Sequence, residues 1–331
     1  MAKVLVRRLG GAIPVLLVLA LVVFILRQIA PIDQVASVVG ENASPEVYAQ
    51  ARQDLGLNDP LPQQYLRYVS HTARGDLGRS TLSQRPISKD LGTFLPATLE
   101  LVAVTFFLIL VLGVLLGMAT AQRWRGSGFL RVGMVFGGSV PTFLLALLGM
   151  LLFYRRLGWL PATGRTSIRD APRNPTGLLT VDGLLAGRFD VVLDALKHLV
   201  LPAACMAIRP AVSVGRVLRS SLQHTLRSDH IRTARVKGLG EKRILIKHAL
   251  RNSSAPVLAL WGLELASLFG STIVVESIFA FPGLGLFTTQ AIARGDFNTI
   301  AAVTMVLGLL YVLANTFVDL LQVLADPRVR L

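Results

Sequence analysis

Six apolar segments run through this chain of 331 residues, and each is about as long as a helix that crosses a bilayer. Because a bilayer offers the backbone no water to bond with, such segments form helices that satisfy their own backbone groups. The sequence therefore predicts an all-α integral membrane protein with six transmembrane helices, at roughly 9–29, 96–121, 132–154, 197–219, 254–276 and 299–322.

The first and fourth segments are the least regular of the six. The first follows Lys3, Arg7 and Arg8, as the apolar part of a signal peptide does. It is longer than that part usually is, and no clear cleavage site follows, so we interpret it as a retained first helix. Lys197 and His198 interrupt the fourth segment near its start.

The distribution of charge predicts the sidedness of the helices. The formal net charge is +15, and Arg123, Arg125 and Arg131 lie close together with no acidic residue between them. Short loops rich in Lys and Arg remain in the cytoplasm. With an even number of spans, both termini are then cytoplasmic. The chain divides into 1–29 (N-terminus and first helix), 30–95 (an extracytoplasmic segment) and 96–331 (a five-helix core with a cytoplasmic loop at 220–253).

The extracytoplasmic segment carries signals of ordered structure. Ser44 is suited to cap a helix that has Pro45 at its first position, and Gly56 is suited to end it. A second helix is predicted from Gln64 to Thr72, and residues 74–80 are predicted to form a loop. We expect this segment to be partly ordered and to serve as a landing surface for a partner outside the membrane.

A strongly basic stretch, Ser228 to Leu258, lies between the fourth and fifth apolar segments. It predicts two short helices, one after Ser228 and one from Gly240 to Ala249, with a hinge at Gly238. Helices this short need a surface to pack on. The stretch is therefore either a docking element or an ordinary basic loop, and a docking element would use its apolar residues, Ile231, Ala234, Leu239, Ile244 and Leu245.

The run Ile231-Arg-Thr-Ala-Arg-Val-Lys-Gly238-Leu, with His248-Ala-Leu-Arg-Asn252 after it, resembles the "EAA" loop of bacterial ABC importer permeases. The resemblance is closest to the branch that imports dipeptides, oligopeptides or nickel. Arg232, Thr233 and Ala234 stand where the general pattern has Glu-Ala-Ala, a departure that is usual in this branch. Further similar runs lie at 75–80, 96–101, 157–164, 275–285 and 315–328.

The resemblance implies a type I ABC importer permease fold in the cytoplasmic (inner) membrane of a bacterium. It implies that the basic loop forms coupling helices that seat in a groove of an ATPase subunit. The residues that the resemblance assigns to this contact are Ile231, Arg232, Thr233, Ala234, Arg235, Lys237, Gly238 and Leu239.

The same resemblance implies a set of partners. They are a second homologous permease subunit, two P-loop ATPase subunits or domains that hold ATP and Mg²⁺, and an extracytoplasmic substrate-binding protein. The implied cargo is a di- or oligopeptide, with nickel or another small solute as the alternative.

The chain lacks the motifs of a catalyst. It contains no Gly-Lys dipeptide and therefore no P-loop, no His-Glu-x-x-His, and one cysteine, Cys205. We therefore expect no catalytic site, no bound cofactor and no metal site in this chain. A second interpretation, from a different functional class, remains: a membrane-embedded regulatory protein whose basic loop binds anionic lipid or nucleic acid. The resemblance favours a transporter, with no nucleic-acid partner.

The fourth segment contains a charge that calls for a partner. Arg209 falls near the bilayer centre, where an isolated charge costs about 3 kcal/mol or more. Glu264, at a similar depth in the fifth segment, is its expected partner. The two residues either form a pair that fixes helix packing or line the pathway and attract a substrate carboxylate. Pro202 and Pro210 predict a bent helix here, beside a cavity or a subunit interface.

Overall fold

The computed structural model describes residues 2–29, 35, 39–40, 43–122, 126–172 and 175–325, and the predicted all-α class is confirmed. Within these ranges the only β-structure is one isolated bridge, between Arg79 and Pro86. The helices are α1 (Ala2–Ile29), α3 (Pro45–Asp54), α4 (Leu61–Ala73), α5 (Ile87–Ala121), α6 (Ser127–Ser139), α7 (Thr142–Gly149), η1 (Met150–Arg156), α8 (Leu179–Leu185), α9 (Phe189–Thr225), α10 (Asp229–Val236), α11 (Glu241–Arg243), η2 (Ile244–Ala249), α12 (Leu250–Asn252), α13 (Ala255–Ile278), α14 (Leu284–Ala293) and α15 (Phe297–Ala325).

Five of these helices are long and apolar enough to cross a membrane, and a sixth span exists if a bent pair is counted as one. The bent pair is α6 with α7 and η1, and the chain direction bends by 106° between them. A single straight span over 132–154 is therefore wrong. The cause lies at Pro141, which cannot donate a backbone hydrogen bond and which disfavours helical geometry at Val140. Val140 is extended, and the helix restarts at Thr142.

The fourth span behaves in the opposite way. α9 continues as one helix through both Pro202 and Pro210, and it is longer than the predicted 197–219. The expected breaks at these prolines are absent from α9. Both residues are buried, which fits the rule that neighbouring helices make prolines tolerable within a span.

The helices α5 and α9 pack closely at the centre of the molecule. A side chain added at Gly113 would lie 2.5 Å from Val214, and one at Gly117 would lie 2.7 Å from Leu218. Small residues at helix contacts let two backbones approach in this way within a membrane. The main buried cluster extends from this contact and includes Leu101, Ile109, Leu199, Leu218 and Leu222.

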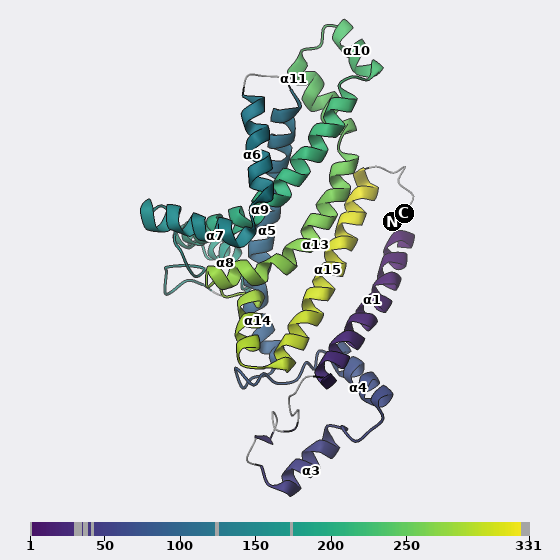
Figure 1. The fold of residues 1–331 in the computed structure, drawn as a ribbon, viewed down its shortest axis with the longest axis vertical. Helices are drawn as coiled ribbons and strands as arrows, with labels where there is room; N and C mark the ends of the chain where they lie inside the picture. Colours follow the sequence, from purple (N-terminus) through teal and green to yellow (C-terminus); the bar gives the residue numbers. More distant parts are fainter. Residues whose placement is uncertain are drawn as a thin grey trace.

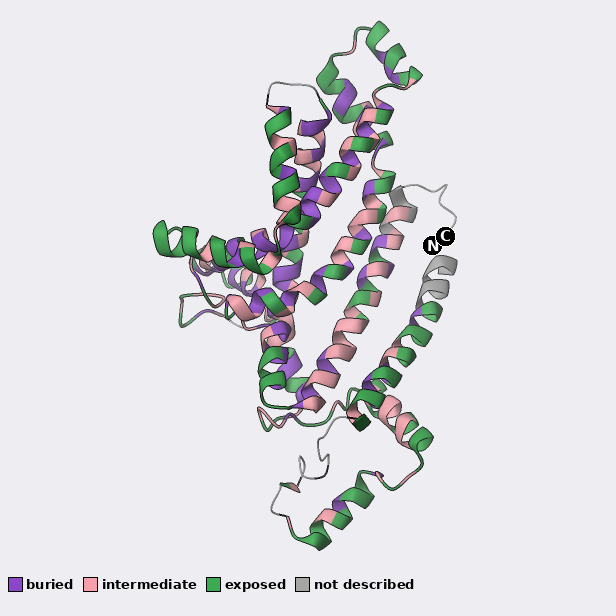
Figure 2. Ribbon diagram, viewed as in Figure 1, coloured by how far each residue is buried: buried purple, intermediate pink, exposed green. Residues whose placement is uncertain are grey.

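Many residues along the long helices are exposed, as Figure 2 shows, and a large share of them are apolar. Large exposed apolar residues occur along α1, α7 and η1, among them Val18, Leu26, Phe143, Leu147 and Leu151. A surface of this kind suits contact with lipid tails or with another membrane subunit rather than with water.

The two hydrophilic regions lie at opposite ends of the helix bundle (Figure 1). At one end, Ser44 accepts a hydrogen bond from the Val47 backbone and caps α3, which begins with Pro45; Gly56 follows the helix at φ +66°. These features confirm the cap and stop signals that the sequence carries. The Tyr65 hydroxyl on α4 donates to the Leu17 carbonyl at 2.8 Å and ties this end to α1. At the other end lie α10 and α11.

A buried carboxylate holds the start of α14. Glu276 has no exposed surface, and its oxygens accept hydrogen bonds from the Thr98 hydroxyl at 2.7 Å and the Gly285 backbone N–H at 2.7 Å. The Leu286 N–H donates to it as well, at 3.2 Å. Free N–H groups at a helix N-terminus favour an anion. Glu276 therefore joins α13, α5 and α14.

Two more buried carboxylates fasten loops at this end. Glu100 on α5 accepts hydrogen bonds from Arg165 at 2.6 Å and from the Thr180 backbone at 2.7 Å, so it anchors the segment between η1 and α9. Asp296, just before α15, accepts from the Ser80 hydroxyl at 2.6 Å. These contacts give both carboxylates a structural role.

Candidate coupling surface

The basic stretch forms a helical hairpin that projects from the bundle. Gly238 sits at φ +77° between α10 and the next helical run, a conformation that favours glycine, so the predicted break between the two helices at Gly238 is confirmed. The second run continues through η2 and α12 to Asn252 rather than ending at Ala249. Ser228 precedes α10 as predicted, but its hydroxyl donates to the Thr225 carbonyl at 2.5 Å instead of capping the helix.

The apolar side of the hairpin packs against the chain itself. Ile231, Ile244 and Leu245 are buried in the same cluster as Leu222 of α9, and Ala234 is 8% exposed. Leu239 is partly buried beside them. The expectation that these apolar residues form the docking face is therefore wrong in its geometry. A helix of eight residues needs its apolar side to stay attached to the protein.

A different side of α10 is accessible. Val236 is 85% exposed, an unusual value for a valine, and Arg232, Thr233, Lys237 and Gly238 are exposed around it. We call these five residues the α10 tip. Figure 2 shows the exposed surface of α10 at the far end of the molecule. Sequence reasoning missed Val236, although it lies within the run that resembles the EAA loop.

The charges of the hairpin are unevenly balanced. Arg235 forms a two-pronged ion pair with Glu241, at 2.6 and 3.2 Å. This contact lowers the pKa of Glu241 and raises that of Arg235. Within the described part of the chain, Arg232 and Lys237 have no ion-pair partner. The α10 tip therefore presents an apolar side chain between two uncompensated positive charges.

The base of the hairpin is joined to two long helices. The Ser253 hydroxyl donates to the Thr225 hydroxyl at 2.9 Å, and both residues are buried. Thr225 ends α9, and α13 begins two residues after Ser253. A force on the α10 tip would therefore act on the ends of α9 and α13 together.

Arg209 and Glu264 lie on those same two helices. Arg209 is exposed on α9, and Glu264 is half-buried on α13. No ion pair of 4.0 Å or less joins them among the described residues. Sequence reasoning missed Arg216, which lies two helical turns from Arg209 on the same side of α9 and is also exposed. The recurrence of arginine at this spacing was the available signal.

The comparisons with known proteins agree with this arrangement. The sequence profile of the family described as "Binding-protein-dependent transport system inner membrane component" matches residues 109–331, and the profile of its N-terminal part matches residues 1–87. The chain belongs to this family of permeases.

Named relatives resemble this permease over their full length. A dipeptide transport system permease protein from Alkalihalophilus pseudofirmus is 38% identical, covering 98% of each chain. A di/tripeptide transport system permease protein from Pseudomonas aeruginosa is 37% identical, covering 100% of this chain and 99% of its own. A probable D,D-dipeptide transport system permease protein from Escherichia coli is 37% identical, covering 99% and 97%.

One cluster of the permease has the residue types of a hydrolase without its geometry. The Ser167 hydroxyl lies 3.4 Å from His198 Nε2, and Asp194 is adjacent. His198 Nδ1, however, bonds to the backbone carbonyl of Asp194 at 2.8 Å, and its distance to the carboxylate is 3.7 Å. That carboxylate instead accepts from Thr166 and from the Ser167 backbone, which attaches their loop to α9. Permeases of this family are non-catalytic membrane components, and these contacts are structural.

Proposed function

We propose that this permease is one of two membrane subunits of an ATP-driven peptide importer in the cytoplasmic membrane of a bacterium. The proposed partners are a second, homologous permease, two P-loop ATPases that hold ATP and Mg²⁺, and a substrate-binding protein on the opposite side. The names of the relatives support peptides over nickel as the cargo. The α10 tip is the observation that carries the proposal.

The coupling mechanism follows from how the hairpin is attached. The apolar base moves with α9 and α13 because it is part of their buried cluster. Closure of two ATPases around ATP displaces the α10 tip, and the hairpin transmits this displacement to both helices. The helices then tilt around a central pathway, of which one chain lines half. The residues assigned to the ATPase contact divide into two groups. The exposed ones touch the ATPase, whereas Ile231, Ala234 and the partly buried Leu239 hold the hairpin in place.

Arg209 faces this pathway in our proposal. A guanidinium near the middle of a span avoids lipid, so the exposed side of α9 that carries Arg209 and Arg216 faces water or the second subunit. A peptide carries a terminal carboxylate that suits an arginine fork. In the alternative, Arg209 and Glu264 form a pair that only fixes helix packing.

A charge exchange separates these two roles. If Arg209→Glu combined with Glu264→Arg restores both assembly and peptide uptake in proteoliposomes, the pair is structural. If assembly returns while uptake stays lost, Arg209 belongs to the pathway. Normal uptake by Arg209→Leu alone would exclude both roles.

Sidedness has a direct test. Single cysteines at Glu46 and Arg74, in a Cys205→Ser background, should react with a membrane-impermeant thiol reagent in intact cells. Both residues are exposed; Glu46 lies on α3 and Arg74 directly follows α4, and these two helices lie at the end opposite α10. Labelling only after lysis would place this end in the cytoplasm and overturn the topology.

Co-purification tests the function as a whole. The permease should bring down a P-loop ATPase and a second permease from detergent extracts, and the reconstituted set should take up peptides when supplied with ATP. A permease that retains anionic lipid or nucleic acid but captures no ATPase would instead be a regulatory membrane protein.

A further inference from the structure

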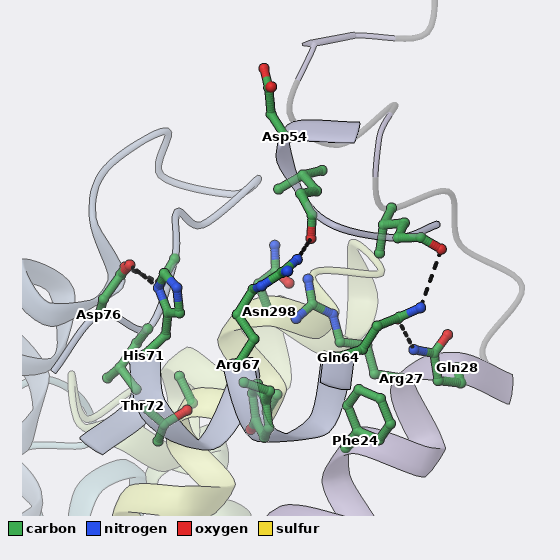
Figure 3. Close-up of a pocket in the computed structure, with 17 residues that line it drawn as sticks. Phe24, Arg27, Gln28, Asp54, Gln64, Arg67, His71, Thr72, Asp76 and Asn298 are labelled. Carbon is green, nitrogen blue, oxygen red and sulfur yellow. Dashed lines mark hydrogen bonds and ion pairs between the residues drawn. The ribbon is translucent and has the colours of Figure 1, made fainter. Parts of the chain in front are cut away.

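A cavity of about 290 Å³ opens where α1, α4 and the start of α15 meet, at the end of the bundle opposite α10 (Figure 3). Its walls include Arg27 from α1, Arg67, Tyr68 and His71 from α4, and Asn298 from α15. A concave site with several converging polar groups is the usual form of a small-ligand site. The transport mechanism proposed above leaves this cavity unused.

The charges around the cavity leave one arginine uncompensated. Arg67 is paired with Asp59 at 2.5 Å and also donates to the Leu55 carbonyl. Arg27 has no ion pair among the described residues, and its Nε is buried without a hydrogen-bond partner there. Arg27 as a whole is partly buried, and a guanidinium withdrawn from water without an anion is costly, because its desolvation is uncompensated.

The acids of the cavity are engaged or peripheral. Asp76 bonds to His71 at 2.8 Å and to the Gly78 N–H at 3.2 Å, and these contacts lower the pKa of Asp76. Asp54 is exposed at the rim and accepts from Gln50. Neither acid is bonded to Arg27, so the interior favours an anion.

Neighbouring residues indicate what kind of anion fits. Leu26 and Ile29, on the same helix as Arg27, are exposed apolar residues that face outward near the end of the span. The ring of Phe24 packs against Tyr65 and Tyr68 at centroid distances of 5.7 and 6.2 Å. Aromatic residues at the end of a span mark the level of lipid headgroups. Burial raises the pKa of Tyr68, whose side chain also lines the cavity.

We propose that this cavity binds the phosphate of a membrane phospholipid, held by the Arg27 fork, with the acyl chains along the apolar side of α1. A guanidinium matches phosphate oxygens in a bidentate manner. The apolar surface beside the cavity favours a lipid over a carboxylate from a partner protein, because a protein side chain brings no acyl chains to cover it. The proposal is independent of the peptide cargo.

Native mass spectrometry of the full-length permease tests it. Delipidated protein is titrated with phosphatidylglycerol and, separately, with diacylglycerol of the same chains, which lacks the phosphate. We expect selective binding of phosphatidylglycerol, and about a tenfold weaker affinity in Arg27→Gln, as the loss of one charge-assisted contact implies. The affinity of Arg27→Lys should fall between these two values. Arg74 is exposed, directly follows α4 and lies outside the cavity, so Arg74→Gln should bind the lipid normally.

Three results would overturn the proposal: equal affinity for phosphatidylglycerol in Arg27→Gln, equal binding of diacylglycerol, or displacement of the lipid by inorganic phosphate at similar concentration. The first result has a diagnostic variant, in which Arg27→Gln binds the lipid normally but no longer binds the substrate-binding protein. This outcome would assign the cavity to a protein carboxylate. If Arg27→Gln does not fold, Tyr68→Phe provides a milder variant, because it removes only a hydroxyl. Its affinity for phosphatidylglycerol should still fall by about threefold. An unchanged affinity would count against the proposal.

Discussion

The two hydrophilic ends of the permease are held together by different forces. At the end with α3 and α4, buried carboxylates such as Glu276 and Glu100 accept hydrogen bonds from segments far apart in the chain. At the α10 end, the hairpin rests on an apolar base, and the ion pair between Arg235 and Glu241 is exposed. Directional bonds fix long loops in one arrangement, whereas an apolar base lets a short hairpin move as a unit with its helices. The difference suits one end for a fixed surface and the other for transmitting force.

The largest expected effect comes from removing a buried carboxylate. Glu276→Leu leaves the Gly285 and Leu286 N–H groups and the Thr98 hydroxyl without their acceptor. Each unsatisfied buried group costs about 1–3 kcal/mol, so the unfolding temperature of the purified protein should fall sharply or folded protein should be lost. Glu241→Leu, at the other end, is the matched control and should change the unfolding temperature little. Equal losses of stability from the two substitutions would contradict the proposed difference in how the two ends are stabilised.

The α10 tip should show the reverse pattern. Val236→Asp should leave thermal stability unchanged, because Val236 touches little of the chain, while weakening ATPase capture by about 30-fold, the loss of one interface hot spot. Ile231→Ala, on the buried side of α10, should lower stability by about 2–5 kcal/mol. Pull-down and thermal unfolding of both variants give the comparison. A stability loss in Val236→Asp would show that the tip is part of the fold.

A proline substitution at Gly238 tests whether the backbone conformation of this glycine is needed for coupling. Gly238→Pro cannot adopt φ +77°, since proline fixes φ near −65°. We expect uptake to be uncoupled from ATP hydrolysis while the protein stays in the membrane. Gly240→Pro is the matched control, because Gly240 already has φ −66°. If uptake by Gly238→Pro remains coupled to ATP hydrolysis, the conformation of Gly238 is not needed for coupling.

The smallest effect belongs to the exposed ion pair. Because Arg235 lowers the pKa of Glu241 in the folded protein, the pair contributes stability above the ordinary glutamate pKa and loses it as pH falls through the folded value. The side chains are 44% and 61% exposed, so the contribution should be below about 1 kcal/mol and should shrink in salt. Unfolding of Glu241→Gln and the native protein across this acid range measures it. A larger, salt-insensitive difference would mean that the hairpin is held by charge.

Local signals in the sequence predicted local structure well. Ser44, Pro45 and Gly56 delimit α3, and Gly238 marks the hinge, because caps and left-handed glycines depend on a few neighbouring residues. The prolines did not follow one rule. Pro141 breaks its span while Pro202 and Pro210 do not, since the outcome depends on how neighbouring helices repair the backbone.

Long-range contacts were beyond the sequence. The periodicity of α10 shows that it has an apolar side, but not whether that side meets its own protein or a partner, and this is why Ala234 was assigned to the docking face. The bond between Thr98 and Glu276 joins residues 178 positions apart. No local pattern in the sequence indicates it.

Site-specific crosslinking tests the coupling account most directly. A single cysteine at Val236, in a Cys205→Ser background, is treated with a short thiol-directed crosslinker in the assembled transporter, and Arg74→Cys serves as the control at the opposite end. The account predicts an adduct between Val236→Cys and a P-loop ATPase, with uptake blocked once the adduct forms, and no ATPase adduct from Arg74→Cys. Absence of an ATPase adduct at Val236, or equal adducts at both positions, would contradict it.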